Sequence, residues 1–533
     1  MVESRNENLM GKNQSAAHSP ASGSTRRDFL RRSVVTAAAA PLAAAIPGSY
    51  GQTGTQVAGK PAKLPNILII HSDQFRWDFV GAAGLNPMSC TPNIDAMYRR
   101  GTVFQNFITN QPLCSPSRAC LWTGQYGTTN GVWKLLWSDN PRVGIKPDAV
   151  TLATQLRAAG YSTNYIGKWH LAPHLKDETW QKCIGYVKPE YRGGFLDLWQ
   201  AANVYELTTH PYHGTIWDGD GHPMHFKDIY RVDYLTDLAE KFLRKKHDKP
   251  FCLVVSQLEP HQDNFVNGFS PPKGYGDKYR NPYIPPDLRA LPGDWPYQAA
   301  NYYGDIKAID QSVGRLLKTL KEQGLEDNTI VVFMSDHGCH FRTRNTEYKR
   351  SPHESSIHVP LMIQGPGFNN RQTITELVSM IDIAPSIMDL VGVKIPSCMQ
   401  GRSFIPLLHD ENARGNWRNE VLVQISESEI ARALRTPEWT YVALAPQANP
   451  LSDPGSLHYQ DYQLYNNRAD PHQLVNMIGR LDARWPDDNV LLNFVGHRRS
   501  MREITSHLRE RLIARIVEAG EDRPEITTWK YYP

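Results

Sequence analysis

The sequence predicts an α/β protein with a large mixed or mostly parallel sheet flanked by helices, followed by a smaller α+β domain. Three runs, 66–71, 251–257 and 329–334, are mostly apolar and do not alternate, which is typical of strands buried on both faces of a parallel sheet. Helical segments separate them, the longest being the amphipathic segment 302–323. Near residue 415 the pattern changes to short strand candidates. These observations predict a large domain over 65–415 and a smaller one over 416–533.

The first 49 residues are predicted to be a targeting segment rather than part of the fold. Arg26 and Arg27 precede Phe-Leu and a small-residue run, 34–46, which is too short for a membrane span. This pattern resembles a twin-arginine export signal, so we expect the twin-arginine export machinery as a partner and a periplasmic or secreted protein. A disordered basic tail would explain the arginines but not the alanine-rich run. Residues 50–64 are then expected to be a linker.

Composition excludes some classes of function. The chain has 533 residues and a net charge of +4, so no broad basic surface indicates a nucleic-acid partner. Beyond the first fifty residues, no apolar run approaches the roughly 18 residues that a spanning helix requires, which predicts no integral membrane span. The seven cysteines have no spacing typical of a metal knuckle, and sequence alone leaves open whether they are paired or free.

The remaining elements follow from local signals. Thr91 and Pro92 mark the start of a helix that Gly101 ends, and Gly160 ends the helix predicted over 151–159. A further helix is expected at 228–245. Further strands of the large sheet are predicted at 103–107, 161–166 and 359–364; the smaller domain should contain strands 421–426, 433–436 and 440–444 and a closing helix, 501–519.

Two pairs of polar residues directly follow two of the buried strands. Asp73 and Gln74 come after the strand 66–71, and Asp336 and His337 come after the strand 329–334. A single aspartate in such a place is usually a turn residue. Two oxygen-rich pairs at the carboxyl ends of strands in one sheet instead favour a shared cation.

Cys114 is a candidate nucleophile. Pro116 suits the first turn of a helix, which places Cys114 just ahead of a helix N-terminus, where free N–H groups favour an anion. Arg118, one turn on, adds a positive charge. A buried inert thiol is the alternative for a cysteine taken alone.

Further candidates come from three other segments. Lys168 and His170 end the predicted strand 161–166, and His261 follows the strand 251–257. Lys349 lies in a polar run with Arg350 and His353, which either shape a pocket or only pack.

Together these motifs resemble the sulfatase family of the alkaline-phosphatase-like superfamily, of the exported bacterial type. The run from Cys114 to Gly124 is similar to the signature C-x-P-S-R followed by L-x-T-G, with Trp122 where a smaller apolar residue is usual. The run from Gly167 to His170 resembles the family's G-K-W-H motif. A pattern between Gln463 and Asn476 extends the resemblance to about residue 480.

The resemblance implies a modified residue and a metal. In this family a maturation enzyme oxidises the signature cysteine, here Cys114, to formylglycine. Asp73, Gln74, Asp336 and His337 map onto the metal ligands, with residue 114 itself as a further ligand. Gln74 replaces the more common second aspartate. Calcium is the expected divalent metal, and manganese or magnesium remains open.

The resemblance also implies roles for the other residues. Lys168 and Lys349 would hold the sulfate with Arg118, His170 would assist residue 114, and His261 would protonate the leaving oxygen. The expected activity is sulfuric ester hydrolysis on a sulfated small molecule or polysaccharide, with a carbohydrate favoured. Two loop regions, 186–228 and 264–298, are rich in aromatic residues and are expected to set specificity.

Two alternatives remain open at this stage. A phosphonate or phosphate ester hydrolase can use the same scaffold. An inactive protein that binds anionic glycans would be expected to have lost motif residues, and none is missing.

Overall fold

The structure is a computed structural model that describes residues 64–136, 143–174, 179–478, 491–494 and 497–528. The expected signal segment 1–49, and the expected linker 50–64 apart from its last residue, lie outside the described residues. Among the helices that are described, none has both the length and the apolar composition needed to cross a membrane.

The centre of the large sheet is β1 (Asn66–Ser72), which runs parallel to β8 (Phe251–Ser256) on one side and to β9 (Thr329–Ser335) on the other. Next to β8 lies β3 (Ser162–Lys168), also parallel. On the other side, β10 (Leu361–Gln364) is antiparallel to β9, so the sheet is mixed, which is one of the two forms predicted. The full order is β11-β2-β10-β9-β1-β8-β3-β4-β6-β5, with β7 paired to β6.

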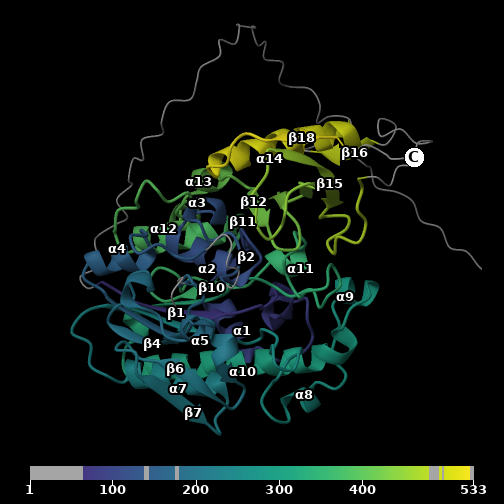
Figure 1. The fold of residues 1–533 in the computed structure, drawn as a ribbon. Coiled ribbons are helices and arrows are strands. Elements are labelled where there is room, and N and C mark those ends of the chain that lie inside the picture. The colour runs from purple at the N-terminus through teal and green to yellow at the C-terminus, as the bar shows by residue number, and fades with distance from the viewer. Residues whose placement is uncertain (1–63, 137–142, 175–178, 479–490, 495–496, 529–533) are drawn as a thin grey trace, which may run out of the picture. The chain divides into compact units, whose positions relative to one another are not determined.

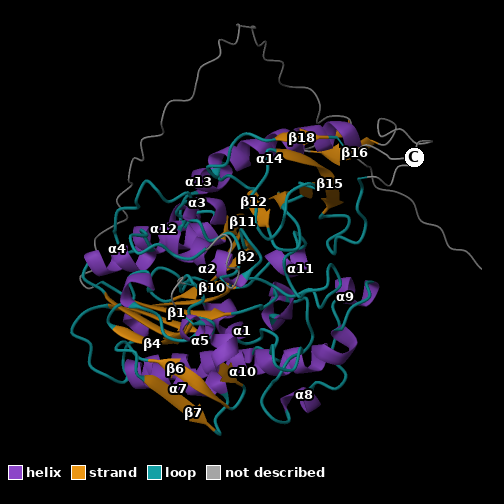
Figure 2. Cartoon of the chain, in the orientation of Figure 1, coloured by secondary structure: helices purple, strands orange, loops and turns teal. Residues whose placement is uncertain are grey.

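Alternate side chains of β1 point into two different cores. Ile67 and Ile69 belong to the core that includes residues of α2 (Cys114–Thr123), α4 (Leu152–Ala158) and α12 (Ile383–Leu390). Leu68 and Ile70 belong to the core on the other face. That core contains residues of α1 (Pro92–Arg100), α7 (Arg231–Leu243) and α10 (Trp295–Glu322). Helices therefore cover both faces of the sheet (Figure 2), which explains why its central strands are mostly apolar.

Most predicted elements are present with shifted ends. The helix predicted at 302–323 is α10, which starts seven residues earlier at Trp295 with Pro296 in its first turn, where proline is tolerated. The helix predicted at 228–245 is the shorter α7. Both differences are at element ends, where hydrophobic periodicity gives little information.

The region 186–228 contains strands that the sequence did not predict. β4 (Leu198–Ala202) pairs with β3 and extends the sheet through β6 (His213–Trp217) to its edge. Between them lie α6 (Tyr205–Thr208) and β5 (Thr209–His210), and β7 (Pro223–Lys227) pairs with β6. The other described elements of this part of the chain are β2 (Thr102–Ile108), α3 (Gly127–Asn130), α5 (Trp180–Ile184), α8 (Tyr275–Lys278), α9 (Pro286–Ala290), α11 (Glu354–Ile357), β11 (Gln372–Ser379) and α13 (Glu411–Gly415).

A second, smaller sheet forms in the C-terminal region. Its strands are β12 (Val421–Ile425), β13 (Ala431–Arg435), β14 (Trp439–Leu444), β15 (His458–Asn466) and β18 (Glu525–Thr527). Of these, β15 and β18 were not predicted. β16 (Leu491–Phe494) and β17 (His497–Ser500) form a separate pair. The domain boundary predicted at residue 415 stays a prediction.

The small sheet packs against the predicted closing helix, α14 (Met501–Glu518). The side chains of Ser500 and Glu503 cap this helix at its start in a capping box. Figure 1 shows the helix in yellow beside β15 and β18. On the other side, the Asn110 side chain donates to the Leu422 carbonyl and the Asn110 backbone carbonyl accepts from the Gln424 N–H, which ties β12 to the chain just before α2.

Cys90, Cys114, Cys120, Cys252, Cys339 and Cys398 are not in disulfides, which answers for these six the question that the sequence left open. Of the seven cysteines, six are buried, and Cys398 is exposed.

Candidate active site

The site lies where β1 and β9 end side by side. The two strands are in register up to Ser72 and Ser335, so the residues that follow, Asp73 and Asp336, emerge together. Both aspartates are fully buried. The backbone of Gln74 turns into the left-handed region (φ 69°), and its N–H donates to Asp336 Oδ1. The sequence predicted these two strands in one sheet, and their pairing in the structure brings the two aspartates together.

Cys114 is the first residue of α2, one position further into the helix than the sequence indicated, and Leu113 is the N-cap. Its side chain is buried with 1% exposure. The Sγ lies 3.3 Å from His337 Nε2 and 3.7 Å from Asp73 Oδ1. Burial opposes ionisation, but Lys168 and Lys349 hold the pKa of the thiol well below its usual value.

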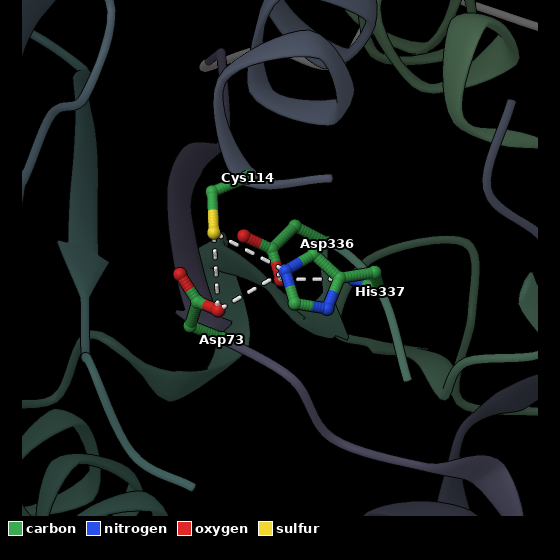
Figure 3. A group of neighbouring side chains, drawn as sticks. All are labelled: Asp73, Cys114, Asp336 and His337. Carbon is green, nitrogen blue, oxygen red and sulfur yellow. Dashed lines mark hydrogen bonds and ion pairs between the residues drawn. The ribbon is translucent and has the colours of Figure 1, made fainter. Parts of the chain in front are cut away.

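Four side chains form a group that could hold a metal ion: Asp73, Cys114, Asp336 and His337 (Figure 3). One ligand atom from each lies within 4.8 Å of all the others. Burial raises the pKa of Asp336 to about 7, and the neighbouring Asp73 carboxylate adds to the rise. A cation between the two carboxylates would remove this repulsion.

The orientation of His337 also fits a metal. Its Nδ1 is 3.0 Å from the Gly338 carbonyl, to which a ring N–H can donate, and its Nε2 is 3.3 Å from Asp73 Oδ1. With the proton on Nδ1, the lone pair of Nε2 faces carboxylates, where a cation would fit. Burial acts to lower the pKa of this ring but Asp336 raises it, so a proton on Nε2 can take that place when no metal is bound.

The surroundings of Gln74 also favour a bound metal. Its Nε2 donates to Cys339 Sγ at 3.5 Å, while its Oε1 is buried and has no hydrogen-bond partner among the described residues. An acceptor oxygen left in this state is costly unless something binds it. Four of the five predicted ligands therefore gather at one place, and Gln74 is joined to them by the hydrogen bond from its N–H to Asp336. The oxygens, nitrogen and sulfur of the four suit a divalent metal.

Arg118 lies beneath this group and is fully buried. Its Nε donates to Asp336 Oδ2 at 3.1 Å and one terminal nitrogen donates to Asp73 Oδ2 at 3.0 Å. The other terminal nitrogen donates to the Lys168 carbonyl and the Ser256 hydroxyl. The guanidinium thus orients the two carboxylates rather than Cys114 itself.

Lys168 and His170 share a partner that the sequence analysis missed. Lys168 Nζ lies 2.9 Å from Asp73 Oδ2 and 3.0 Å from Glu206 Oε1, and His170 Nδ1 lies 3.5 Å from the same Oε1. Burial acts to raise the pKa of Glu206, but Lys168 and His170 lower it to about 2. Nothing in the sequence marks Glu206, because α6 is short and lies 38 residues after Lys168.

The second lysine forms a pair with the third candidate segment. Lys349 Nζ is 3.0 Å from Cys114 Sγ and 2.7 Å from His261 Nε2. Because His261 Nδ1 is 2.6 Å from the Gln262 carbonyl, that nitrogen carries the proton and Nε2 accepts from Lys349. Burial and then Lys349 lower the pKa of His261.

A cavity of about 280 Å³ opens over these residues. Cys114, Glu206, His261 and Lys349 are at its base. The rest of its lining consists of Leu135, Gln262, Asn264, Asn267, Arg342, Glu347, Tyr348 and Arg350.

The two residues next to Lys349 that the sequence left open have separate roles. Arg350 lines the cavity and pairs with Glu427 at 2.9 Å. His353 instead packs against the small sheet, with Nε2 3.1 Å from the Tyr465 hydroxyl.

Two family models match the chain. The model described as Sulfatase matches residues 65–393, and the model described as N-sulphoglucosamine sulphohydrolase, C-terminal, matches residues 346–484.

Curated relatives are similar over most of the chain. An ulvan-active sulfatase of Formosa agariphila is 29% identical, over 89% of this chain and 88% of that protein. Arylsulfatase K of Bos taurus is 25% identical over 90% of each chain. An N-acetylglucosamine-6-O-sulfatase of Bacteroides thetaiotaomicron is 25% identical over 79% of this chain and 84% of that protein.

Solved structures share the fold. A structure from work on glycosaminoglycan metabolism by Bacteroides thetaiotaomicron aligns with a TM-score of 0.71 and 23% identity, over 86% of this chain and 97% of that one. A structure in complex with its substrate, D-glucosamine-2-N,6-O-disulfate, aligns with a TM-score of 0.65 and 23% identity, over 87% of this chain and 99% of that one. With the family model covering more than half of its length, the chain belongs to the sulfatase family.

Proposed function

We propose that this sulfatase hydrolyses a sulfate ester of a carbohydrate, using a divalent metal and a formylglycine made from Cys114. The observation that carries the proposal is the cavity in which Cys114 lies between a metal-ligand group and two lysines. The carbohydrate substrate rests on the relatives, whose names include an ulvan-active sulfatase and an N-acetylglucosamine-6-O-sulfatase.

The metal would be held by Asp73, Gln74, Asp336, His337 and residue 114. When bound, it supplies positive charge against the sulfate oxygens as negative charge gathers on them. Oxygen ligands favour calcium; because Gln74 is neutral and His337 adds a nitrogen, manganese and magnesium remain alternatives.

The formylglycine would supply a hydrated aldehyde at the position of Cys114, with one hydroxyl to attack sulfur and a second to expel the product. The Cβ of Cys114 is the carbon that would carry both hydroxyls. Lys168 and Lys349 lie on the two sides of this position, where they can bind sulfate oxygens and stabilise the transition state.

Protons are assigned to two histidines. His261 lines the cavity beside Lys349, and we assign it the proton transfer to the leaving oxygen. Lys349 Nζ, which is hydrogen bonded to His261 Nε2, is assigned as the donor that supplies this proton to Nε2. His170 is among the groups that lower the pKa of the Cys114 thiol, and we assign it as the base when the bound sulfate is released.

The experiment that tests the proposed function measures sulfate release from a panel of sulfated oligosaccharides and from matched aryl sulfate and aryl phosphonate esters. We expect sulfate release from at least one oligosaccharide and much slower phosphonate hydrolysis. Cys114→Ala should abolish turnover and leave the melting temperature unchanged. Faster phosphonate than sulfate hydrolysis would instead support the alternative ester hydrolase on this scaffold.

Maturation is tested separately by mass spectrometry. Conversion of Cys to formylglycine replaces sulfur and two hydrogens by one oxygen, so the peptide that contains residue 114 should be lighter by about 18 Da. A fully active preparation in which residue 114 is still cysteine, shown by its alkylation with iodoacetamide after denaturation, would disprove the modification.

We also propose export through a twin-arginine pathway, on the basis of Arg26, Arg27 and the alanine-rich run that follows them. In a bacterial host with that pathway, Arg26→Lys combined with Arg27→Lys should keep the protein in the cytoplasm. Equal periplasmic amounts of the variant and the unchanged chain would contradict this proposal.

A further inference from the structure

We propose that Glu206 is a positioning residue for sulfate ester hydrolysis. Its carboxylate holds Lys168 and His170 near residue 114, and its negative charge lowers the affinity of the pocket for free sulfate. The inference rests on the proposed function, because it assigns Glu206 a role in the same reaction.

The backbone explains why Glu206 reaches this place. β3 and β4 pair up to Lys168 and Ala202, and the pairing continues as the His170 N–H donates to the Asn203 carbonyl at 2.7 Å. His170 is held there with a left-handed backbone (φ 60°), which a residue other than glycine adopts only when its surroundings enforce it. Three residues after Asn203, α6 directs Glu206 back into the site.

The contacts connect Glu206 to both sides of the reaction centre. One oxygen, Oε1, lies 3.0 Å from Lys168 Nζ and 3.5 Å from His170 Nδ1. Lys168 in turn lies 2.9 Å from Asp73 Oδ2, and both Lys168 and His170 are among the groups that lower the pKa of the Cys114 thiol. A single carboxylate therefore fixes both a sulfate-binding ammonium and the imidazole that serves residue 114.

Because the Glu206 carboxylate is buried, its negative charge acts strongly on an anion in the cavity. Glu206 is only 2% exposed and lines the cavity together with Cys114. Its second oxygen, Oε2, has no hydrogen-bond partner among the described residues, so Oε1 alone makes the contacts with Lys168 and His170. A negative charge beside an anion pocket reduces the affinity for sulfate, which favours product release, while it keeps the lysine in place.

The test compares Glu206→Gln with the unchanged protein. The amide keeps the shape and can still accept from Lys168, but it carries no charge. We expect kcat on a sulfated sugar to fall about 10- to 100-fold, as for other residues that orient catalytic groups. The dissociation constant of sodium sulfate, measured by calorimetry on the same preparation, should fall by about 3- to 10-fold, because a repelling charge has been removed.

Two further variants show whether the effect of Glu206 comes from the position of its carboxylate, from its charge or from a general loss of protein stability. Glu206→Asp keeps the charge but is one methylene shorter, so its kcat should fall while its sulfate affinity stays closer to that of the unchanged protein. Asp461→Asn is the matched control, because Asp461 is a buried carboxylate that pairs with Arg509 at 2.6 Å in the small sheet. It should lower the melting temperature and leave kcat and sulfate affinity unchanged.

The inference is overturned if Glu206→Gln keeps the kcat of the unchanged protein, or if it binds sulfate more weakly. It is likewise overturned if Asp461→Asn reproduces both changes. If the unchanged protein releases no sulfate from any substrate, the proposed function fails instead, and the direction of the change in sulfate affinity still decides the effect of Glu206 on the pocket.

Discussion

Several hydrogen-bond donors orient the carboxylate of Asp336, a proposed metal ligand. Its carboxylate accepts from Arg118, from the N–H of Gln74 and from the N–H of His337, and it lies 3.7 Å from the His337 imidazole. These donors fix both oxygens before any ion binds. A pre-oriented carboxylate loses little conformational entropy on metal binding, which favours tight binding.

Asp336→Asn should therefore release the metal. The change removes one of two carboxylates from a set in which Gln74 is already neutral. We expect metal content by elemental analysis to fall to background, and activity to return only when excess calcium or manganese is added.

The control for this prediction is Asp218→Asn. Asp218, Asp220 and His222 form the only other group in the described residues with metal-ligand spacing, and Asp220 and His222 are exposed. Asp218→Asn should leave the metal content unchanged. Full metal content in Asp336→Asn would show that the ion is not bound where Figure 3 places these four side chains.

His261 allows a second test at this scale, because a proton donor matters most for a poor leaving group. His261→Ala should slow hydrolysis of a sugar sulfate by about 10²- to 10⁴-fold and that of a nitrophenyl sulfate much less. The measurement is kcat/KM for the two substrates, with His222→Ala as an exposed control that should change neither. An equal loss on both substrates would mean that His261 binds sulfate and transfers no proton.

At the scale of elements, a short hairpin forms part of the rim of the cavity. Asp263 and Gly268 pair as an isolated antiparallel bridge, and Asn264 and Asn267 line the cavity. Phe265 between them is 51% exposed, and its ring stacks on His210 of β5 at 4.0 Å. An exposed aromatic face supported from behind is suited to stack on a sugar ring.

Phe265→Ala should therefore weaken binding of a sulfated oligosaccharide. We expect KM to rise about 3- to 10-fold, equivalent to roughly 0.5–1.5 kcal/mol of lost stacking. A small aryl sulfate, which does not extend to the rim, should be unaffected. Tyr297→Ala removes a ring that is 83% exposed and lies on α10, outside the hairpin 263–268, so it should change neither substrate; a similar rise in KM there would contradict the assignment.

Elements with a strong periodic signal are those that the sequence predicted. β1 and β9 are mostly apolar because both faces are covered, and this pattern placed Asp73 and Asp336 at the ends of two buried strands. That the two strands are neighbours was not predicted, and the family resemblance was needed to assign both aspartates to one site. β4 to β7 form a sheet edge, where partly exposed strands alternate irregularly and give no comparable signal. Glu206 was missed for the same reason, since its position depends on that edge.

At the scale of the whole molecule, acid stability is set in part by buried histidines. Burial lowers the pKa of His340 from 6.5 to about 3, and its Nε2 is 3.0 Å from the Lys349 carbonyl. Above about pH 6.5 the ring is neutral in both states. Between about pH 6.5 and 3 only the unfolded chain binds the proton, so the free energy of unfolding falls as the pH falls.

His340→Gln should reduce this pH dependence. The amide nitrogen of glutamine can replace Nε2 as a donor to the Lys349 carbonyl but does not titrate. The slope of unfolding free energy against pH, measured by urea denaturation between pH 6 and 4, should decrease by about 1.4 kcal/mol per pH unit. His458→Gln, at a side chain that is 80% exposed, should leave the slope unchanged. An unchanged slope in His340→Gln would show that this ring is protonated in the folded protein.

The burial of Cys114 has a consequence for when its modification can take place. With 1% of its surface exposed, at the base of a cavity of about 280 Å³, the side chain is out of reach of a second enzyme once the chain has folded. On the proposed chemistry, oxidation has to precede folding, and a chain that folds first keeps its thiol permanently. The specific activity of a preparation would then depend on how often oxidation of Cys114 is completed before the chain folds. Refolding a purified inactive fraction would restore its structure but not its turnover.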